Sequence, residues 1–285
     1  MLYGITEHNR NFIYSFDGKE KKKVFETEKL ITNFVGSLDG KKIAFVSKNK
    51  IWIIGIENRK KKIFSLSCSN PLSLPYSLSF SPKGEKIAFL FGEKSPFKTN
   101  LWIIDCKDWS LKQLTSKNNI FFNDNPLPLS WSPNGNKILV LQDLRDKTVI
   151  ELVNLKGDSK EYIFEGIEID LFRPIFSKNG EEIVFIGKTK ENLASNIYIL
   201  NLETQKLEQI TKFKDINVCG EMSFSYDGRK IAFVVFDKGY NIWVINKDET
   251  GLKKLTNNLD NSNYHYPIWL KDDKLACLKI KTLKE

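Results

Sequence analysis

The side chains best suited to molecular recognition lie in six short segments, each just before a strand that recurs along the chain. The segments contain amides, carboxylates, an arginine, a histidine and tyrosines, which form hydrogen bonds, pair with charges or offer amphipathic contact area. Two segments contribute residues 32–33 and 76–77. The candidate binding residues in the other four are Asn123, Asp124, Asn125, Asp170, Arg173, Glu221, Asn263, Tyr264, His265 and Tyr266.

Two of these groups suggest more definite roles. Arg173 and Glu221 occupy equivalent positions in neighbouring repeats, so their side chains either pair across a channel to serve a ligand or only neutralise each other there. The run from Asn263 to Tyr266 is rich in tyrosine, which is enriched at protein interfaces. Ordinary packing is the alternative interpretation of that run.

Catalytic patterns are missing from the sequence. No Gly-x-Ser-x-Gly elbow of a hydrolase occurs, and the two histidines, His8 and His265, are too few for a three-histidine metal site. The four cysteines show no Cys-x-x-Cys spacing, and we expect Cys106 and Cys277, which lie in strand patterns, to be small buried residues. We therefore predict no catalytic residues, no metal and no cofactor. A pair of acids suited to glycoside hydrolysis remains an open alternative.

The elements that position these residues repeat about every 44 to 51 residues. In each repeat an apolar strand leads to a turn, often Asn-Gly or Asp-Gly, and then to a second apolar strand, which predicts a β-hairpin. The repeats are centred on Ser37, Ser81, Ser132, Ser177, Ser225 and Leu270. A fixed period of this length is typical of a propeller, a solenoid or an array.

Two further strands follow most hairpins. Third strands rich in β-branched and aromatic residues are predicted at 51–54, 100–105, 196–201 and 241–246, with aromatic residues such as Trp243 packing between sheets. Polar fourth strands follow at 111–115, 207–211 and 252–256. Apolar inner strands and a charged outer strand are what a radial blade requires, because its outer edge faces water. The sequence predicts an all-β, six-bladed propeller of four-stranded antiparallel blades.

The two chain ends are predicted to share one blade. The sixth repeat ends after two strands, and residues 12–17 and 22–26 match the third-strand and fourth-strand patterns. We therefore expect N-terminal strands at about residues 11–26 to pair with residues 266–280, within a single domain covering residues 1–285. Residues 2–5 either compete with or extend the second strand of that blade.

Three recurring motifs carry a resemblance to a known family. The segments Ser-Pro-x-Gly-x-Lys-Ile-Ala-Phe, Asn-Ile-Trp-Val-Ile-Asn and Leu-Lys-x-Leu-Thr resemble the repeats of TolB-like propellers, and also those in propeller domains of prolyl-oligopeptidase-type peptidases. Departures are Gly36 before the first repeat serine, Glu151 at an aromatic third-strand position, and Asp273 in place of a turn glycine. The resemblance implies a scaffold that binds other proteins, and relatives named for TolB work in the periplasm.

Composition agrees with a soluble chain. The formal net charge is +9, but the densest basic runs, 19–23 and 59–62, fall at predicted edge strands, where lysine prevents edge-to-edge pairing, so nucleic acid is an unlikely partner. No segment has the length and apolarity of a membrane span. As the chain stands we expect a cytoplasmic monomer, or a periplasmic or extracellular protein if a leader has been removed.

The function predicted from these observations is that of a non-catalytic propeller. It binds a protein or peptide on the face where the segments before the first strands meet, at the mouth of the central channel. The alternative is a small-molecule or carbohydrate site with hydrolase or lyase activity in the same channel.

Overall fold

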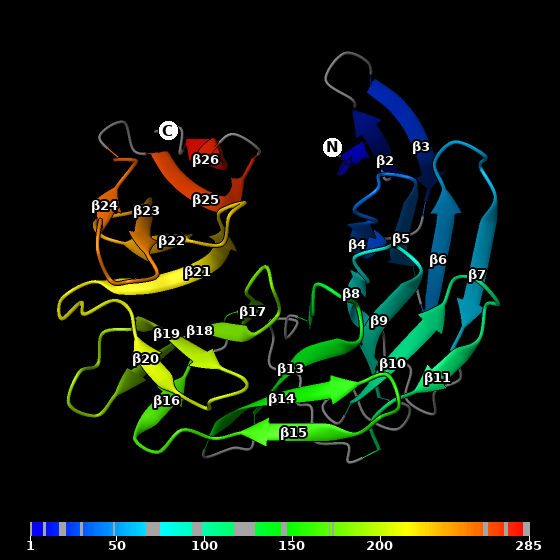
Figure 1. Cartoon of the computed structure of the whole chain (residues 1–285). Helices are drawn as coiled ribbons and strands as arrows, with labels where there is room; N and C mark the ends of the chain where they lie inside the picture. Colours follow the sequence, from blue (N-terminus) through cyan, green and yellow to red (C-terminus); the bar gives the residue numbers. More distant parts are fainter. Residues whose placement is uncertain are drawn as a thin grey trace. The chain divides into compact units, whose positions relative to one another are not determined.

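In the computed structural model, most of the chain forms β-strands and the turns between them. The structure covers residues 2–7, 10–16, 21–28, 31–47, 49–66, 75–92, 99–116, 129–143, 147–170, 172, 174–258, 262–270 and 273–281. Across these ranges the chain forms strands and no α-helix (Figure 1). The same ranges hold no helix with the length and apolar character needed to cross a membrane. The all-β prediction is confirmed.

The chain divides into two compact units, which we describe separately. The first comprises Met1–Leu129 and Leu155–Gly157 and the second Ser130–Asn154 and Asp158–Glu285. The first unit holds the sheets β1-β2-β3, β4-β5-β6-β7 and β11-β10-β9-β8. Its strands are β1 (Leu2–Glu7), β2 (Arg10–Phe16), β3 (Lys21–Thr27), β4 (Ile31–Gly36), β5 (Lys42–Ser47), β6 (Lys50–Gly55), β7 (Lys61–Ser65), β8 (Tyr76–Phe80), β9 (Lys86–Phe91), β10 (Asn100–Asp105) and β11 (Leu111–Gln113).

The second unit continues the pattern of antiparallel sheets. They are β12-β13-β14-β15, β16-β18-β19-β20 with β17 also on β18, β21-β22-β23-β24, and β25-β26. Its strands are β12 (Ser130–Trp131), β13 (Lys137–Asp143), β14 (Thr148–Asn154), β15 (Ser159–Tyr162), β16 (Ile167–Ile169), β17 (Ile175–Phe176), β18 (Glu182–Thr189), β19 (Asn196–Asn201), β20 (Leu207–Gln209), β21 (Asn217–Phe224), β22 (Lys230–Phe236), β23 (Tyr240–Asn246), β24 (Lys253–Lys254), β25 (Ser262–Trp269) and β26 (Leu275–Lys281).

The recurring serine motif builds the hairpin turn between first and second strands. In the turn between β21 and β22, Ser225 Oγ bonds Asp227 Oδ1 at 2.6 Å and accepts a hydrogen bond from the Lys230 amide at 2.9 Å. Gly228 supplies the left-handed backbone, with φ of 72°. The same bond from the second strand to the serine recurs at Ser37, Ser81, Ser132 and Ser177. The motif is thus a structural clamp.

A second clamp explains the other two motifs. In the sheet β21-β24 the Thr256 hydroxyl accepts a hydrogen bond from the Ile242 amide at 2.9 Å and lies 3.4 Å from Asn241 Oδ1. The pairs Asn100 with Thr115 and Asn196 with Thr211 repeat this arrangement. Asparagine at the start of the third strand and threonine after the fourth therefore hold these two strands together.

Aromatic residues fill the space between neighbouring sheets of the same unit. Trp243 packs edge-on against Phe213, which follows the outer strand of the preceding sheet, at a ring separation of 5.6 Å. Both belong to a core that joins β17–β19 to β21–β23 and contains the fully buried Phe233. Trp52 in the first unit contacts Phe25 of β3 at a ring separation of 5.5 Å, with the rings tilted by 51°. The prediction that third-strand aromatics pack between sheets is confirmed here.

The sheet β12-β15 departs from this pattern at Glu151. Instead of an aromatic pair it buries the Glu151 carboxylate, 1% exposed, which accepts a hydrogen bond from the amide of Gln142, also 1% exposed. A polar group is stable at such a buried site only when it is hydrogen-bonded. Glu151, which departs from the aromatic pattern of the sequence, therefore has a polar partner in Gln142 on the neighbouring strand.

The chain ends form strands as the sequence predicts. β2 and β3 match the expected third and fourth strands, and β1 pairs along β2 from Leu2↔Ser15 to Glu7↔Arg10. In the second unit β25 pairs with β26. Closure of one blade by residues 11–26 and 266–280 would join the two units, and it stays a prediction.

Within the second unit taken by itself, the expectation that both strand-pattern cysteines are buried is not met at Cys277. Its side chain is exposed on β26, a strand that pairs only with β25 among the described strands of the second unit. Cys106 is half-buried in the turn after β10. Burial depends on which strands cover a residue, and the apolar pattern of a single strand does not predict which strands will cover it.

Candidate functional site

Four of the ten candidate residues lie outside the described part of the chain. They are Asn123, Asp124, Asn125 and Arg173. The pairing of Arg173 with Glu221 therefore stays a prediction. The other six are described, and all of them belong to the second unit.

Glu221 lies on a bulge of β21. The pairing with β22 runs through Val218↔Val235 and resumes at Met222↔Phe233, so three residues of β21 oppose Val234 alone. Gly220 makes the bulge possible, with φ of 109° and a backbone that passes close to Val234. Bulges redirect side chains and are common beside functional sites.

Smaller bulges, with two residues opposite one, occur in three other first strands. In β25 the register shifts between His265 and Ile268, where Tyr266 has φ of 53°. Asn33 in β4 and Ser77 in β8 lie at matching shifts, with φ of 49° and 54°. These bulged residues lie in the variable segments that precede each repeat serine, or Leu270 in the sixth repeat. The sequence thus located the bulged positions without revealing the bulges.

The bulges of β21 and β25 bring Glu221 and Tyr266 into contact. The Tyr266 amide donates to Glu221 Oε2 at 3.4 Å. The negative charge of Glu221, together with partial burial and a hydrogen bond to the same carboxylate, raises the pKa of the Tyr266 phenol. Tyr266 therefore stays neutral and can act as a hydrogen-bond donor.

Cys219 lies within electrostatic range of both Glu221 and Asp170. Burial raises the pKa of the Cys219 thiol to about 11, and the charges of Glu221 and Asp170 contribute in the same direction. Asp170 follows β16, and burial raises its own pKa, against the opposing effects of a Ser195 hydrogen bond and the Lys188 charge. Cys219 is consequently a protonated thiol at neutral pH and a poor nucleophile.

Four aromatic rings continue from Tyr266 across the end of the β22–β23 hairpin. Ring centroids are 6.3 Å apart for Tyr266 and His265, 4.6 Å for His265 and Tyr240, and 5.1 Å for Tyr240 and Phe236. Tyr266 is 54% exposed, Phe236 49% and Tyr240 36%. We call these four residues the aromatic row. With Glu221, Asp170 and Cys219 they form what we call the mouth-side cluster, a name taken from the channel face that the sequence predicts.

Asn263 and Tyr264 have different roles. Asn263 Oδ1 accepts a hydrogen bond from the Tyr240 amide at 3.1 Å and so fixes β25 against the β22–β23 hairpin. Tyr264 precedes His265 on a strand, where neighbouring side chains point to opposite faces. Its ring lies under Lys279 Nζ at 5.4 Å. The structure thus separates Tyr264 from the aromatic row.

Three members of the cluster are missing from the sequence prediction. Tyr240 and Phe236 pair across the end of a hairpin, and Cys219 lies in the bulged β21. Phe236 and Tyr240 lie on either side of the turn that contains Gly239. Exposed aromatics beside a turn glycine were the available signal for that part of the surface.

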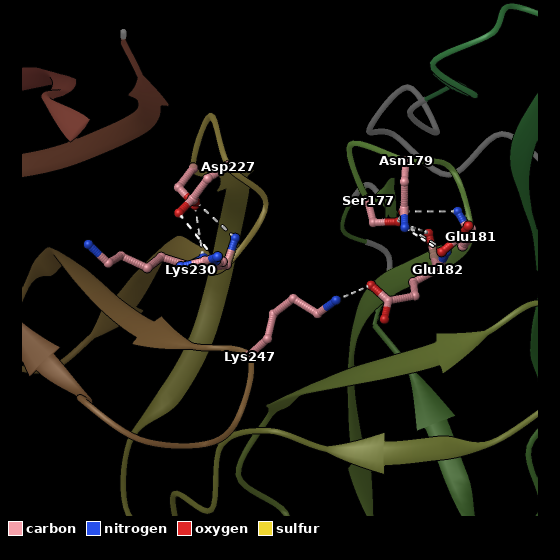
Figure 2. A network of polar contacts seen from close by, with 9 residues as sticks. Ser177, Asn179, Glu181, Glu182, Asp227, Lys230 and Lys247 are labelled. Carbon is pink, nitrogen blue, oxygen red and sulfur yellow. Dashed lines mark hydrogen bonds and ion pairs between the residues drawn. The ribbon is translucent and has the colours of Figure 1, made fainter. Parts of the chain in front are cut away.

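The opposite ends of these strands surround a cavity of about 760 Å³. Figure 2 shows Lys247 extending toward Glu182 of the neighbouring sheet, and the ion pair measures 2.5 Å. Asp227 and Asp248 face their own turns, and hydrogen bonds from Ser225 and Thr250 lower the pKa of each carboxyl. The cavity is lined by Ser177, Lys178, Asn179, Asp227, Gly228, Arg229, Lys230, Asn246, Lys247, Asp248 and Asp273. Most of these polar groups belong to the turns that recur in each repeat.

No group of three or more histidine, cysteine or acidic side chains able to hold a metal ion is found among the residues that the structure describes. The mouth-side cluster offers carboxylates, a neutral phenol and aromatic surface. This chemistry suits noncovalent recognition.

The repeated four-stranded sheets define the fold as a β-propeller. In sequence the chain is similar to the Tol-Pal system protein TolB of Francisella tularensis, 31% identical over 106 residues. That match covers 36% of this chain and 23% of the relative, so the chain matches about a quarter of the length of such curated relatives. No family model matches the chain.

Solved structures agree on the fold. The β-propeller domain of the Trilobed protease of Pyrococcus furiosus, which has an open velcro topology, is 19% identical, with a TM-score of 0.66 over 98% of this chain and 87% of that one. Oligogalacturonate lyase of Vibrio parahaemolyticus is 13% identical, with a TM-score of 0.67 over 93% and 78%. The predicted resemblance to TolB and to peptidase propellers is confirmed. The number of six blades stays a prediction.

Proposed function

We propose that this chain is a non-catalytic β-propeller that binds a protein or peptide through the mouth-side cluster. The observation that carries the proposal is the aromatic row, four contiguous rings, three of them at least 36% exposed, beside the Glu221 carboxylate. Aromatic residues supply large contact areas at low cost in side-chain entropy and are enriched at protein interfaces. Strands and bulges position them, so little order has to be gained on binding.

The likeness to TolB supports a protein partner. The matched stretch is short, however, and the proposal therefore depends on the surface of this chain. Because the resemblance to TolB implies a periplasmic setting, we propose that compartment in preference to the cytoplasm. The monomeric state stays a prediction.

Affinity capture with a matched pair of variants tests the proposal. The test variant replaces Tyr240, His265 and Tyr266 with alanine, and the control replaces Ile163, Leu193 and Tyr226, which are 54%, 75% and 68% exposed elsewhere on the second unit. A protein captured by the wild type and the control, and lost from the test variant at unchanged melting temperature, is then purified and its dissociation constant measured. Equal capture by both variants would remove the mouth-side cluster as the binding surface.

The alternative function is a small-molecule or carbohydrate site with hydrolase or lyase activity. It is supported by Asp170 and Glu221, two carboxylates whose charges both raise the pKa of the Cys219 thiol. The likeness to oligogalacturonate lyase concerns the fold alone. Incubation with oligogalacturonate and analysis of chain length, in the wild type and in Glu221→Gln, tests this alternative.

A further inference from the structure

We propose that the mouth-side cluster accepts a cationic side chain of its partner, an arginine in preference to a lysine. The cation would lie between the Glu221 carboxylate and the rings of His265 and Tyr266. This inference rests on the proposed function, because it specifies the chemistry of the protein that binds there.

The first argument is the charge of Glu221. Nearby acids have a basic neighbour within the chain: Asp237 pairs with Lys254 at 2.9 Å, and Glu168 with Lys188 at 3.2 Å. Glu221 makes no ion pair with any of the described residues, and it accepts a hydrogen bond from the Tyr266 amide. The chain carries 44 lysines and arginines against 35 acids. None of the described cations neutralises this carboxylate, so its partner is either a cation from outside or Arg173, which lies outside the described residues.

The second argument is a contrast between the two faces of β25. On one face the chain places its own cation over a ring, since Lys279 Nζ lies 5.4 Å from the centre of Tyr264. On the other face, His265 and Tyr266 have no cation over them from the described residues. A cation within about 6 Å of an aromatic centroid is attracted by the ring. Among the described residues, the rings of His265 and Tyr266 therefore offer a similar surface for a cation, and no described cation lies over them.

The third argument is the electrostatic effect of Glu221 on its neighbours. Its charge raises the pKa of the Tyr266 phenol and contributes to the raised pKa of the Cys219 thiol. Both groups are neutral at neutral pH, so neither adds a competing negative charge that would need its own partner. Of the two carboxylates in the cluster, Glu221 is the one that contacts the exposed Tyr266.

Arginine fits this arrangement better than lysine. Its guanidinium is planar, so it can stack on a tyrosine or histidine ring while its edge donates two hydrogen bonds to a carboxylate. Glu221 and the neighbouring rings lie on adjacent bulged strands, which offer an acceptor and a flat surface together. A lysine ammonium would satisfy the carboxylate alone.

The test uses a short fluorescent peptide of alternating arginine and glycine, and a second peptide in which citrulline replaces each arginine. Citrulline has nearly the same shape without the charge. Binding is measured by fluorescence anisotropy at about 0.15 M salt, where weak surface electrostatics are screened. The proteins are the wild type, Glu221→Gln, Tyr266→Ala and the control Glu208→Gln, which removes one acid from the outer strand β20.

We expect the wild type and Glu208→Gln to bind the arginine peptide roughly tenfold more tightly than the citrulline peptide. Glu221→Gln should abolish that preference, and Tyr266→Ala should reduce it. Equal binding of the two peptides by the wild type, or equal losses in Glu208→Gln and Glu221→Gln, would overturn the inference.

The outcome is separable from that of the proposed function. If the partner captured with the wild type is lost from the Tyr240, His265 and Tyr266 variant but binds Glu221→Gln with unchanged affinity, protein binding stands and cation recognition is wrong. If capture does not depend on the aromatic row, both are wrong.

Discussion

Strands β22 and β26 are second strands of successive repeats in the second unit, and they differ sharply in burial. The five residues 231–235 of β22 are each 0% exposed, whereas β26 is exposed from Ala276 to Lys281. Their sequences are alike: Ile-Ala-Phe-Val-Val in β22 corresponds to Leu-Ala-Cys-Leu-Lys in β26. Burial of a second strand therefore comes from the third strand and the neighbouring sheet.

The hairpin β25–β26 carries an apolar surface that its own unit leaves uncovered. Ile268, Leu278 and Ile280 are 57%, 48% and 47% exposed. A two-stranded hairpin is marginally stable in water at best, and an open apolar edge invites association with another chain. The comparison with β22 indicates what is missing, namely a third and a fourth strand, and residues 11–26 remain the predicted source of them.

Deleting residues 1–26 gives the largest expected effect. Overall stability is not sufficient as a readout, because β2 and β3 also build a core in the first unit with Ile13 and Val24. We therefore propose to measure hydrogen exchange strand by strand. If the ends share a blade, β26 amides are protected in the full chain and exchange like free peptide after the deletion.

The amides of β22 serve as the internal control, because β21 and β23 cover them on both edges. They should keep their protection in the truncated chain. Unprotected β26 amides in the intact protein, or protection that survives the deletion, would show that the chain ends do not pair.

A matched pair of substitutions should give an intermediate effect. Val234→Ala removes a fully buried side chain from β22 and should cost about 2 kcal/mol of unfolding free energy. Leu278 is the corresponding residue of β26 and is 48% exposed. With a closed blade, Leu278→Ala should cost more than about 1 kcal/mol in the full chain and almost nothing after deletion of residues 1–26. Urea denaturation measures both values, and a negligible cost in the full chain argues against closure.

The parts of the fold that the sequence predicts are those determined by local bonds. The serine turn and the asparagine–threonine clamp each join residues of one blade, so every repeat contains the information, as in Ser225 with Lys230 and Asn241 with Thr256. The sheets, their strand order and the packing of Trp243 follow from these patterns.

The candidate site could be predicted only in part. Its bulges depend on the register between two strands, and a bulge at Glu221 or Tyr266 changes no hydrophobic pattern that the sequence displays. The contact between these two residues joins positions 45 apart in the chain. The exposure of Cys277 depends on strands elsewhere, so its apolar surroundings were misleading.

The smallest effect should come from the turn of the last hairpin. Asp273 takes the place of Gly228 and adopts the same left-handed backbone, with φ of 56° against 72°. Asp273→Gly should therefore stabilise the protein by roughly 0.5–1 kcal/mol, since glycine adopts this conformation without strain, and Gly228→Asp should destabilise it by about 1 kcal/mol. Thermal unfolding of both variants measures the difference.

The ion pair between Asp273 and Lys230, 3.4 Å long with side chains 55% and 37% exposed, is the competing contribution. Exposed pairs of this kind contribute at most about 1 kcal/mol and often nothing measurable. Asp273→Asn separates the two effects, because asparagine tolerates the left-handed region but carries no charge. If Asp273→Gly and Asp273→Asn are equally destabilising, the charge matters more than the backbone, and Asp273 would be an electrostatic link between the last hairpin and β22. If Asp273→Gly is stabilising and Asp273→Asn is neutral, backbone strain at Asp273 is the larger of the two effects.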